Sequence, residues 1–246
     1  MLEFFDCNCC YGYFTRSIFK AAKNPQELIE EMEFCGIKRA LVYHSEMFFH
    51  SPLDGNITLV NEIKDYPQLI PTRAILPPQT EEQAINDIFL EELKKQGIKS
   101  LISFPNENHY FLDRETFGSL FNELIIRKIP LFICATLGQI RDILRDYPEL
   151  IIIAISQGPH ILDRYFRPLI ENYPNFYFDI SSYLAENGIE SFCSKYGPDR
   201  LIFGTGYPAN YMGSAMFRLA QADIPDAYKE AIASKNLDRI LSEVKV

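Results

Sequence analysis

The chain has 246 residues, of which 47% are hydrophobic and 23% are charged, a composition typical of a soluble globular core. Its formal net charge of −9 argues against a phosphate backbone as a partner, and no apolar run approaches the roughly 20 residues of a membrane span. We therefore expect neither a nucleic-acid partner nor a membrane partner.

Short apolar runs alternate with amphipathic stretches along the whole chain. Apolar residues at spacings of three and four predict helices, and short apolar runs bounded by Gly or Pro predict buried strands. The predicted strands are Leu2–Cys7, Ala40–Tyr43, Leu69–Leu76, Ser100–Phe104, Pro130–Cys134, Leu150–Ala154, Phe176–Ile180 and Leu201–Gly204. The predicted helices are Pro25–Cys35, Thr58–Asp65, Glu81–Gln96, Glu115–Arg127, Ile140–Tyr147, Leu162–Asn172, Glu190–Tyr196, Ser214–Ala222, Asp226–Ala233 and Leu237–Val244.

The alternation of eight predicted strands with helices implies parallel pairing through crossover connections. Eight such units favour a closed (β/α)8 TIM barrel over an open doubly wound sheet. We expect residues 1–246 to form this barrel as a single domain. The stretch Ser45–Gly55 is predicted to be a long loop that serves as a lid over the active face.

Six segments spread along the chain carry a resemblance to one known family. They are FDCNCCYG (5–12), IPLFIC (129–134), IIAISQG (152–158), NYPNFYFDISS (172–182), GPDRLIFGTGYP (197–208) and KNLDRIL (235–241). In this order they resemble motifs of the amidohydrolase-related family, in the branch of aminocarboxymuconate decarboxylase-like barrels. The match is most specific in the last three segments.

The resemblance implies an amidohydrolase-like barrel whose strand ends hold a divalent metal. The family's usual ligands are two His on the first strand, a His on the fifth, often a His on the sixth, and an Asp on the eighth that is also the general base. A coordinated zinc lowers the pKa of water from about 15.7 to about 7. Here those positions hold other residues, namely Asn8, Cys10, Cys134, Ser156 and Gly206.

Amide and hydroxyl oxygens are weak zinc ligands and glycine has no side chain, so neither a metal nor another cofactor is expected. One alternative stays open because thiolates bind zinc well: Cys10, Cys134 and His44 would then form a substitute site. Cys134 is also a candidate catalytic nucleophile with a histidine such as His44 as its base. Otherwise these positions are simply filled by small residues.

Three further residues are candidates for the substrate pocket. His44 follows the second predicted strand and is expected to line the pocket. Arg73 either binds a carboxylate bidentately or forms a salt bridge with a nearby acid. Tyr207 either supplies a phenol to the pocket or packs under the last loop. The strand acids Asp6 and Asp179 are expected to support neighbouring loops rather than to react.

The resemblance implies a hydrolase or lyase that acts on a small polar or carboxylated molecule in the barrel mouth. The replaced ligands favour an alternative, a catalytically inactive pseudoenzyme that binds a small molecule or a partner protein. A third interpretation is a structural subunit of a homo-oligomer, with Phe48 and Phe49 at its interface. Because Met1–Asp6 lacks an export signal, we expect a cytoplasmic protein with six reduced cysteines.

Overall fold

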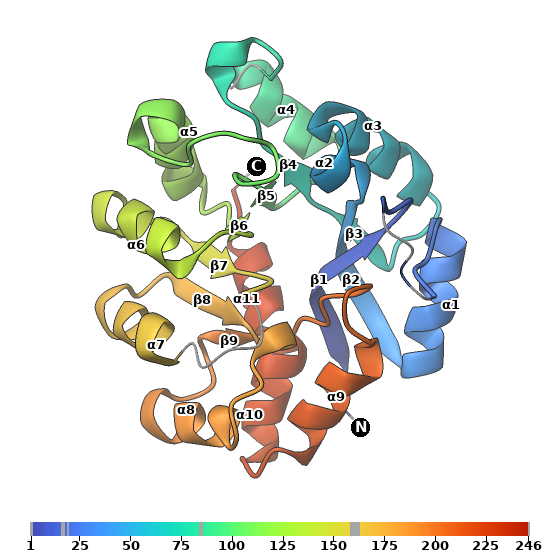
Figure 1. The fold of residues 1–246 in the computed structure, drawn as a ribbon, viewed down its shortest axis with the longest axis vertical. Helices are drawn as coiled ribbons and strands as arrows, with labels where there is room; N and C mark the ends of the chain where they lie inside the picture. The colour runs from blue at the N-terminus through green and yellow to red at the C-terminus, as the bar shows by residue number, and fades with distance from the viewer. Residues whose placement is uncertain (1, 16–17, 19, 84–85, 158–162, 246) are drawn as a thin grey trace.

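Parallel strands form a ring that is surrounded by helices (Figure 1). This computed structural model describes residues 2–15, 18, 20–83, 86–157 and 163–245. The strands are β1 (Phe4–Tyr11), β2 (Ile37–His44), β3 (Leu69–Pro71), β4 (Arg73–Ala74), β5 (Leu101–Ser103), β6 (Leu131–Ile133), β7 (Ile152–Ala154), β8 (Phe176–Asp179) and β9 (Leu201–Ile202). The α-helices are α1 (Pro25–Cys35), α2 (Glu46–Phe49), α3 (Pro52–Ile63), α4 (Asp87–Lys95), α5 (Arg114–Arg127), α6 (Leu137–Asp146), α7 (Asp163–Asn172), α8 (Gly188–Tyr196), α9 (Met212–Gln221), α10 (Asp226–Glu230) and α11 (Asn236–Ser242).

Backbone hydrogen bonds join the first strand to the last and close the ring. The strands pair in the orders β1-β2-β3 and β4-β5-β6-β7-β8-β9, and only Thr72 separates β3 from β4. At the seam, Cys7 N donates to Phe203 O (3.0 Å) and Cys10 N donates to Tyr207 O (3.0 Å). β3 and β4 thus act as one bent third strand, and the predicted (β/α)8 barrel is confirmed.

The core is a continuous apolar layer between the ring of strands and the helices. Every residue of β5, β6, β7 and β8 is buried, as expected for parallel strands that are covered on both faces. Helix ends follow local sequence signals. In α1, for example, the Asn24 side chain accepts from Glu27 N, and Gly36 ends the helix with a left-handed φ of 84°.

Several predicted segments differ from the structure. The first strand runs to Tyr11 rather than ending at Cys7, and the helix predicted to begin at Thr58 begins at Pro52. The helix predicted to begin at Glu81 begins at Asp87, because the Asn86 side chain accepts from Phe89 N and caps the helix there. The predicted lid loop Ser45–Gly55 is instead helical, since it contains α2 and the first turn of α3. Leu162, the first residue of another predicted helix, lies outside the described residues.

The two Phe residues of the predicted interface pack on neighbouring rings. The Phe48 ring packs edge-on against Phe104, with ring centroids 5.1 Å apart, and Phe49 packs edge-on against Phe48 at 4.6 Å. Phe49 keeps 37% of its surface exposed. Part of the apolar surface of this pair is therefore used inside the chain, and the interface itself stays a prediction.

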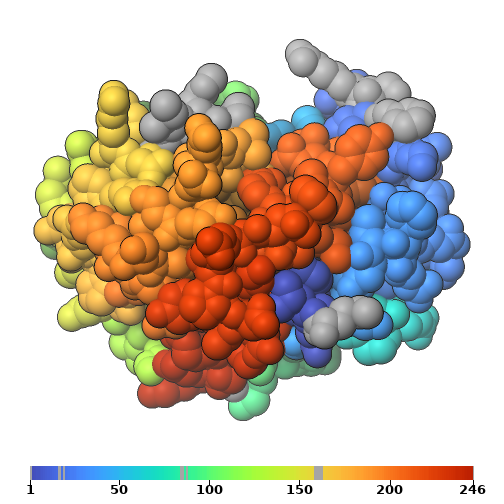
Figure 2. All heavy atoms as spheres, turned by 90° about the horizontal axis from the view of Figure 1, so that it is seen from below, coloured from blue at the N-terminus to red at the C-terminus, as the bar shows by residue number. Residues whose placement is uncertain are grey.

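The C-terminal part of the chain packs against the first strand on the barrel wall. Figure 2 shows the C-terminal helices, in orange and red, packed between the blue N-terminal part and the yellow-orange units. The π-helical turn η3 (Ala231–Lys235) contacts both β1 and β9. Over the ranges that the structure describes, no helix combines the length and apolar character that a bilayer crossing requires.

We expect Asn56 on α3 to be essential for stability, because it completes the hydrogen bonding of the bent third strand. Its Nδ2 donates to Ala74 O (2.9 Å), and its Oδ1 accepts from Ala74 N (2.8 Å), in a buried environment. Asn56→Ala leaves Ala74 N unpaired, while Ala74 O keeps only its longer bond from Gln83 Nε2 (3.3 Å), and should lower the free energy of unfolding by about 1–3 kcal/mol. Urea denaturation measures this loss.

Ile57→Ala is the matched control, since Ile57 lies on the same helix with 62% of its surface exposed. A loss for Asn56→Ala no larger than that of the control contradicts the role given to this side chain.

Candidate functional site

Asn8 joins two strand ends inside the barrel. Its side chain is fully buried, and its Nδ2 donates to Asp179 Oδ2 (2.9 Å) and to Ser156 Oγ (3.1 Å). Ser156 is exposed and has a left-handed φ of 56°. β1, β8 and the segment after β7 therefore meet at one amide group, at the boundary between the barrel interior and solvent.

The Asp179 carboxylate is fully engaged by its neighbours. Oδ1 accepts from Ser181 N (2.7 Å), and Oδ2 accepts from Ser181 Oγ (2.6 Å) as well as from Asn8. Gly204 packs so closely that a Cβ there would lie 2.2 Å from Asp179 Oδ1. Burial raises the pKa of Asp179, and the hydrogen bonds from Ser181 and Asn8 partly offset this.

Asp6, the second buried acid, ties β1 to the segment after β9. Its Oδ1 accepts from Thr205 N (2.9 Å) and from Asn8 N (3.0 Å), and its Oδ2 accepts from Thr205 Oγ1 (2.5 Å). Burial raises its pKa from 3.8 to about 6, although these hydrogen bonds act in the opposite direction. Both acids thus have the supporting contacts that the sequence suggested.

Tyr43 lies beside Cys10, and sequence reasoning missed it. β1 and β2 pair in parallel with Cys10 opposite Tyr43 and Tyr11 opposite His44. Residues that are paired in this way lie on the same face of the sheet, so Tyr43 shares a face with Cys10. Burial raises the pKa of the Cys10 thiol well above its usual value, partly offset by a hydrogen bond with Tyr43. The position of Tyr43 follows from the register between β1 and β2, which the sequence alone does not give.

His44 lies on the opposite face, which is a correction to its predicted place in the pocket. Its ring meets Tyr11 edge-on at 5.2 Å, and its Nδ1 accepts from Glu46 N (3.3 Å). Burial lowers its pKa. The zinc site suggested for His44 with Cys10 and Cys134 is therefore not assembled, and His44 is not placed as a base for Cys134.

Arg73 and Tyr207 also form contacts outside the pocket, which was one of the two alternatives that the sequence left open for each. Arg73 Nη1 donates to Glu92 on α4 (2.9 Å), and the guanidinium stacks on the Phe89 ring. The buried Tyr207 hydroxyl donates to Lys20 O (2.7 Å) and accepts from Ala22 N (2.8 Å). Neither a carboxylate-binding arginine nor a pocket phenol comes from these two residues.

The positions of the family's metal ligands do not fit a metal ion here. Asn8 directs an N–H toward the buried acid, where a cation would need a lone pair. Gly206 has a φ of 67°, and a Cβ there would lie 2.8 Å from Asn210 Nδ2 and 3.2 Å from Ser181 Cβ. Within the described part of the chain, no three His, Cys, Asp or Glu side chains gather to hold a metal ion.

Cys134 lies beside Ser156 at the mouth and is half-buried. Burial and, to a smaller extent, the negative charge of Glu107 raise the pKa of its thiol to about 12, and a hydrogen bond with Ser156 partly offsets them. A thiol in this environment stays protonated at neutral pH, which makes it a poor nucleophile.

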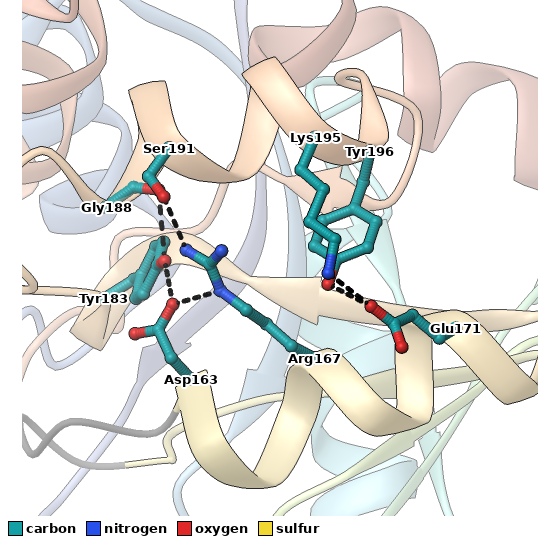
Figure 3. A network of polar contacts seen from close by, with 8 residues as sticks. All are labelled: Asp163, Arg167, Glu171, Tyr183, Gly188, Ser191, Lys195 and Tyr196. Atoms are coloured by element: carbon teal, nitrogen blue, oxygen red, sulfur yellow. Dashed lines mark hydrogen bonds and ion pairs between the residues drawn. The ribbon is translucent and has the colours of Figure 1, made fainter.

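A groove of about 570 Å³ lies between α7 and α8, in the outer layer of helices (Figure 3). Four of its charged groups form two ion pairs. Arg167 Nε donates to Asp163 Oδ1 (2.5 Å), while Lys195 Nζ and Tyr196 Oη both donate to Glu171 Oε1 (2.6 Å each). This network links two helices, and we place the functional site at the barrel mouth instead.

Comparison with known proteins gives one family and a set of related folds. The family model described as "Amidohydrolase" matches residues 19–242. No curated protein matches the chain. Similar solved structures include a Rhizobium 2,6-dihydroxybenzoate decarboxylase (12% identity, 98% of this chain and 99% of that one, TM-score 0.76) and a Novosphingobium aromaticivorans 5-carboxyvanillate decarboxylase mutant with bound manganese (16%, 98% and 97%, 0.78). Another is a probable 2-pyrone-4,6-dicarboxylic acid hydrolase of Acinetobacter baumannii with bound citric acid (14%, 98% and 100%, 0.73).

We expect Cys134 to react slowly with iodoacetamide. With a pKa of about 12, only about one thiol in 30,000 is ionised at pH 7.5. The alkylation rate should keep rising with pH beyond pH 10, as followed by mass spectrometry of the Cys134 peptide. The urea-unfolded chain is the control, and a rate that levels off near neutral pH contradicts the assignment.

We expect ionisation of Asp6 to lower stability. A pKa raised from 3.8 to about 6 means that the fold favours the protonated acid, so this stabilisation is full below pH 3.8 and is lost as pH rises through 6. The free energy of unfolding of the wild type, relative to Asp6→Asn, should fall by about 1.4 kcal/mol between pH 5.0 and 7.5. Urea titrations at several pH values measure the difference, and a flat difference contradicts this role.

Proposed function

The chain belongs to the amidohydrolase family, and on that premise we propose that it is a barrel that binds a small polar molecule at its mouth without the family's metal-dependent hydrolysis. The observation that carries this proposal is the orientation of Asn8. At a position where the family has a metal ligand, an amide N–H lies between the Asp179 carboxylate and the Ser156 hydroxyl. The amide N–H thus supplies a partial positive charge that stabilises the buried carboxylate.

The groups around Asn8 support the same reading. Asp179 is buried and already accepts three hydrogen bonds from Asn8 and Ser181, so it is poorly placed to activate an attacking water. Asp6 has a pKa near neutrality but is held by the backbone of Asn8 and by Thr205. The Cys10 and Cys134 thiols stay protonated. A general base needs both a suitable pKa and access to the substrate, and none of these groups combines the two.

A second candidate is a hydrolase or lyase that acts on a small carboxylated molecule. What favours it is the Ser156 hydroxyl, which is exposed at the mouth and adjoins the Cys134 thiol. The decarboxylases and the hydrolase with similar folds are named for carboxylated compounds. Such an activity here would have to proceed with the residues present, without the family's aspartate on the eighth strand.

Elemental analysis combined with a turnover assay distinguishes the two candidates. The protein is purified without chelators or a metal-affinity tag, then tested with and without added manganese or zinc on aryl carboxylates, lactones and amides. We expect far less than one metal per chain and no turnover above the rate in buffer. About one metal per chain, with turnover that is lost in Cys134→Ala, contradicts the proposal and supports the second candidate.

A further inference from the structure

The end of α1, on the outside of the barrel (Figure 1), carries an exposed aromatic ring beside a surface pocket. Phe34 keeps 86% of its surface exposed, whereas most Phe side chains in folded proteins are buried. The residue before it, Glu33, lines a pocket of about 380 Å³ between α1, the start of β2 and the turn before β3. The ring and the pocket therefore adjoin, because consecutive Cα atoms are only about 3.8 Å apart.

The pocket has an apolar floor and a charged rim. The floor consists of three buried side chains, and exposed charged groups stand on either side of the opening. The floor residues are Ile29, Met32 and Ile37, and the charged residues of the rim are Glu33 and Lys38. The entrance at Gly36 is open, since a Cβ built there would have no atom within 4 Å. An apolar centre inside a polar rim is the usual anatomy of a protein interface.

Phe34 does not fill this pocket in its own chain. Leu28, Ile29 and Met32 hold the face of α1 that points to the core. Phe34 follows Met32 by two positions, which corresponds to a turn of about 200° around the helix, so its ring points away from the core. The ring thus offers apolar surface to a partner, and burying it there would remove that surface from water.

The two charges on the rim are available to the same partner. Glu33 and Lys38 are both exposed, and no ion pair among the described residues includes either of them. A matching partner carries a cation opposite Glu33, an anion opposite Lys38 and an apolar side chain beside them. The same patch on a second copy of the chain provides all three, which is the self-complementarity that a two-fold interface requires.

We propose that this face of α1 is the interface of a homodimer with two-fold symmetry, in which each Phe34 ring occupies the pocket of the other copy. Glu33 of each chain then faces Lys38 of the other, so the ion pair forms twice. The interface lies at the end of the barrel where the strands begin, because Ile37 is the first residue of β2. It is thus separate from the mouth, where the strands end, and does not depend on the proposed binding function.

Sedimentation velocity of the full chain tests the inference at concentrations of about 1–500 µM. With one aromatic anchor per subunit, we expect a weak reversible dimer with a Kd of about 10–100 µM. Phe34→Ala should raise this Kd at least about 30-fold, because symmetry removes both anchors at once. Phe111→Ala is the matched control and should leave the Kd unchanged, since Phe111 is 81% exposed in the segment after β5, at the other end of the barrel.

Charge reversal separates this interface from any other mode of association. Glu33→Lys and Lys38→Glu each bring like charges together and should each raise the Kd about tenfold. The double variant Glu33→Lys/Lys38→Glu restores opposite charges and should return to within about threefold of the wild type. A dimer that persists in Phe34→Ala, or a double variant that associates no better than the single ones, overturns the inference. A wild-type chain that stays monomeric at about 500 µM also overturns it and leaves the pocket to a partner other than this chain.

Discussion

The hydrogen bonds of the Asn8 amide to Asp179 and Ser156 hold the centre of the molecule together. A carboxylate that is fully removed from water is tolerated only when nearby dipoles or charges compensate for it. In this barrel the compensation comes from N–H and O–H groups of Asn8 and Ser181. Because the amide nitrogen is used in this way, the amide oxygen Oδ1 has no hydrogen-bond donor among the described residues.

The same constraint underlies our proposal that the chemistry of the family does not transfer with its fold. Two glycines near the strand ends show how closely the present residues fit their neighbours. Gly204 leaves room for Asp179, and Gly206 has a backbone conformation that an aspartate would adopt only with strain. The family's barrel framework is retained, while its strand ends form a small polar network of amides, hydroxyls and thiols.

The sequence predicted the barrel well because its signals are local and repeated. The helix predicted at Pro25–Cys35 has the same bounds in the structure, since Asn24 and Gly36 mark its ends. The start of α4 was placed too early because no apolar period shows that Asn86 is the cap. The site was less predictable, since it depends on which face each strand residue occupies. β1 changes register between Asp6 and Cys9, and the face of each residue near its end follows from that irregularity.

Asn8 and Asp179 are separated by 171 positions in the chain, and the partner of Asp6 at Thr205 lies 199 positions away. Contacts between residues so distant in sequence form late, because the intervening chain must first be ordered. During synthesis the first strand is therefore made long before its binding partners exist. The polar network around Asn8 and Asp6 is therefore complete only when the last strand joins the first.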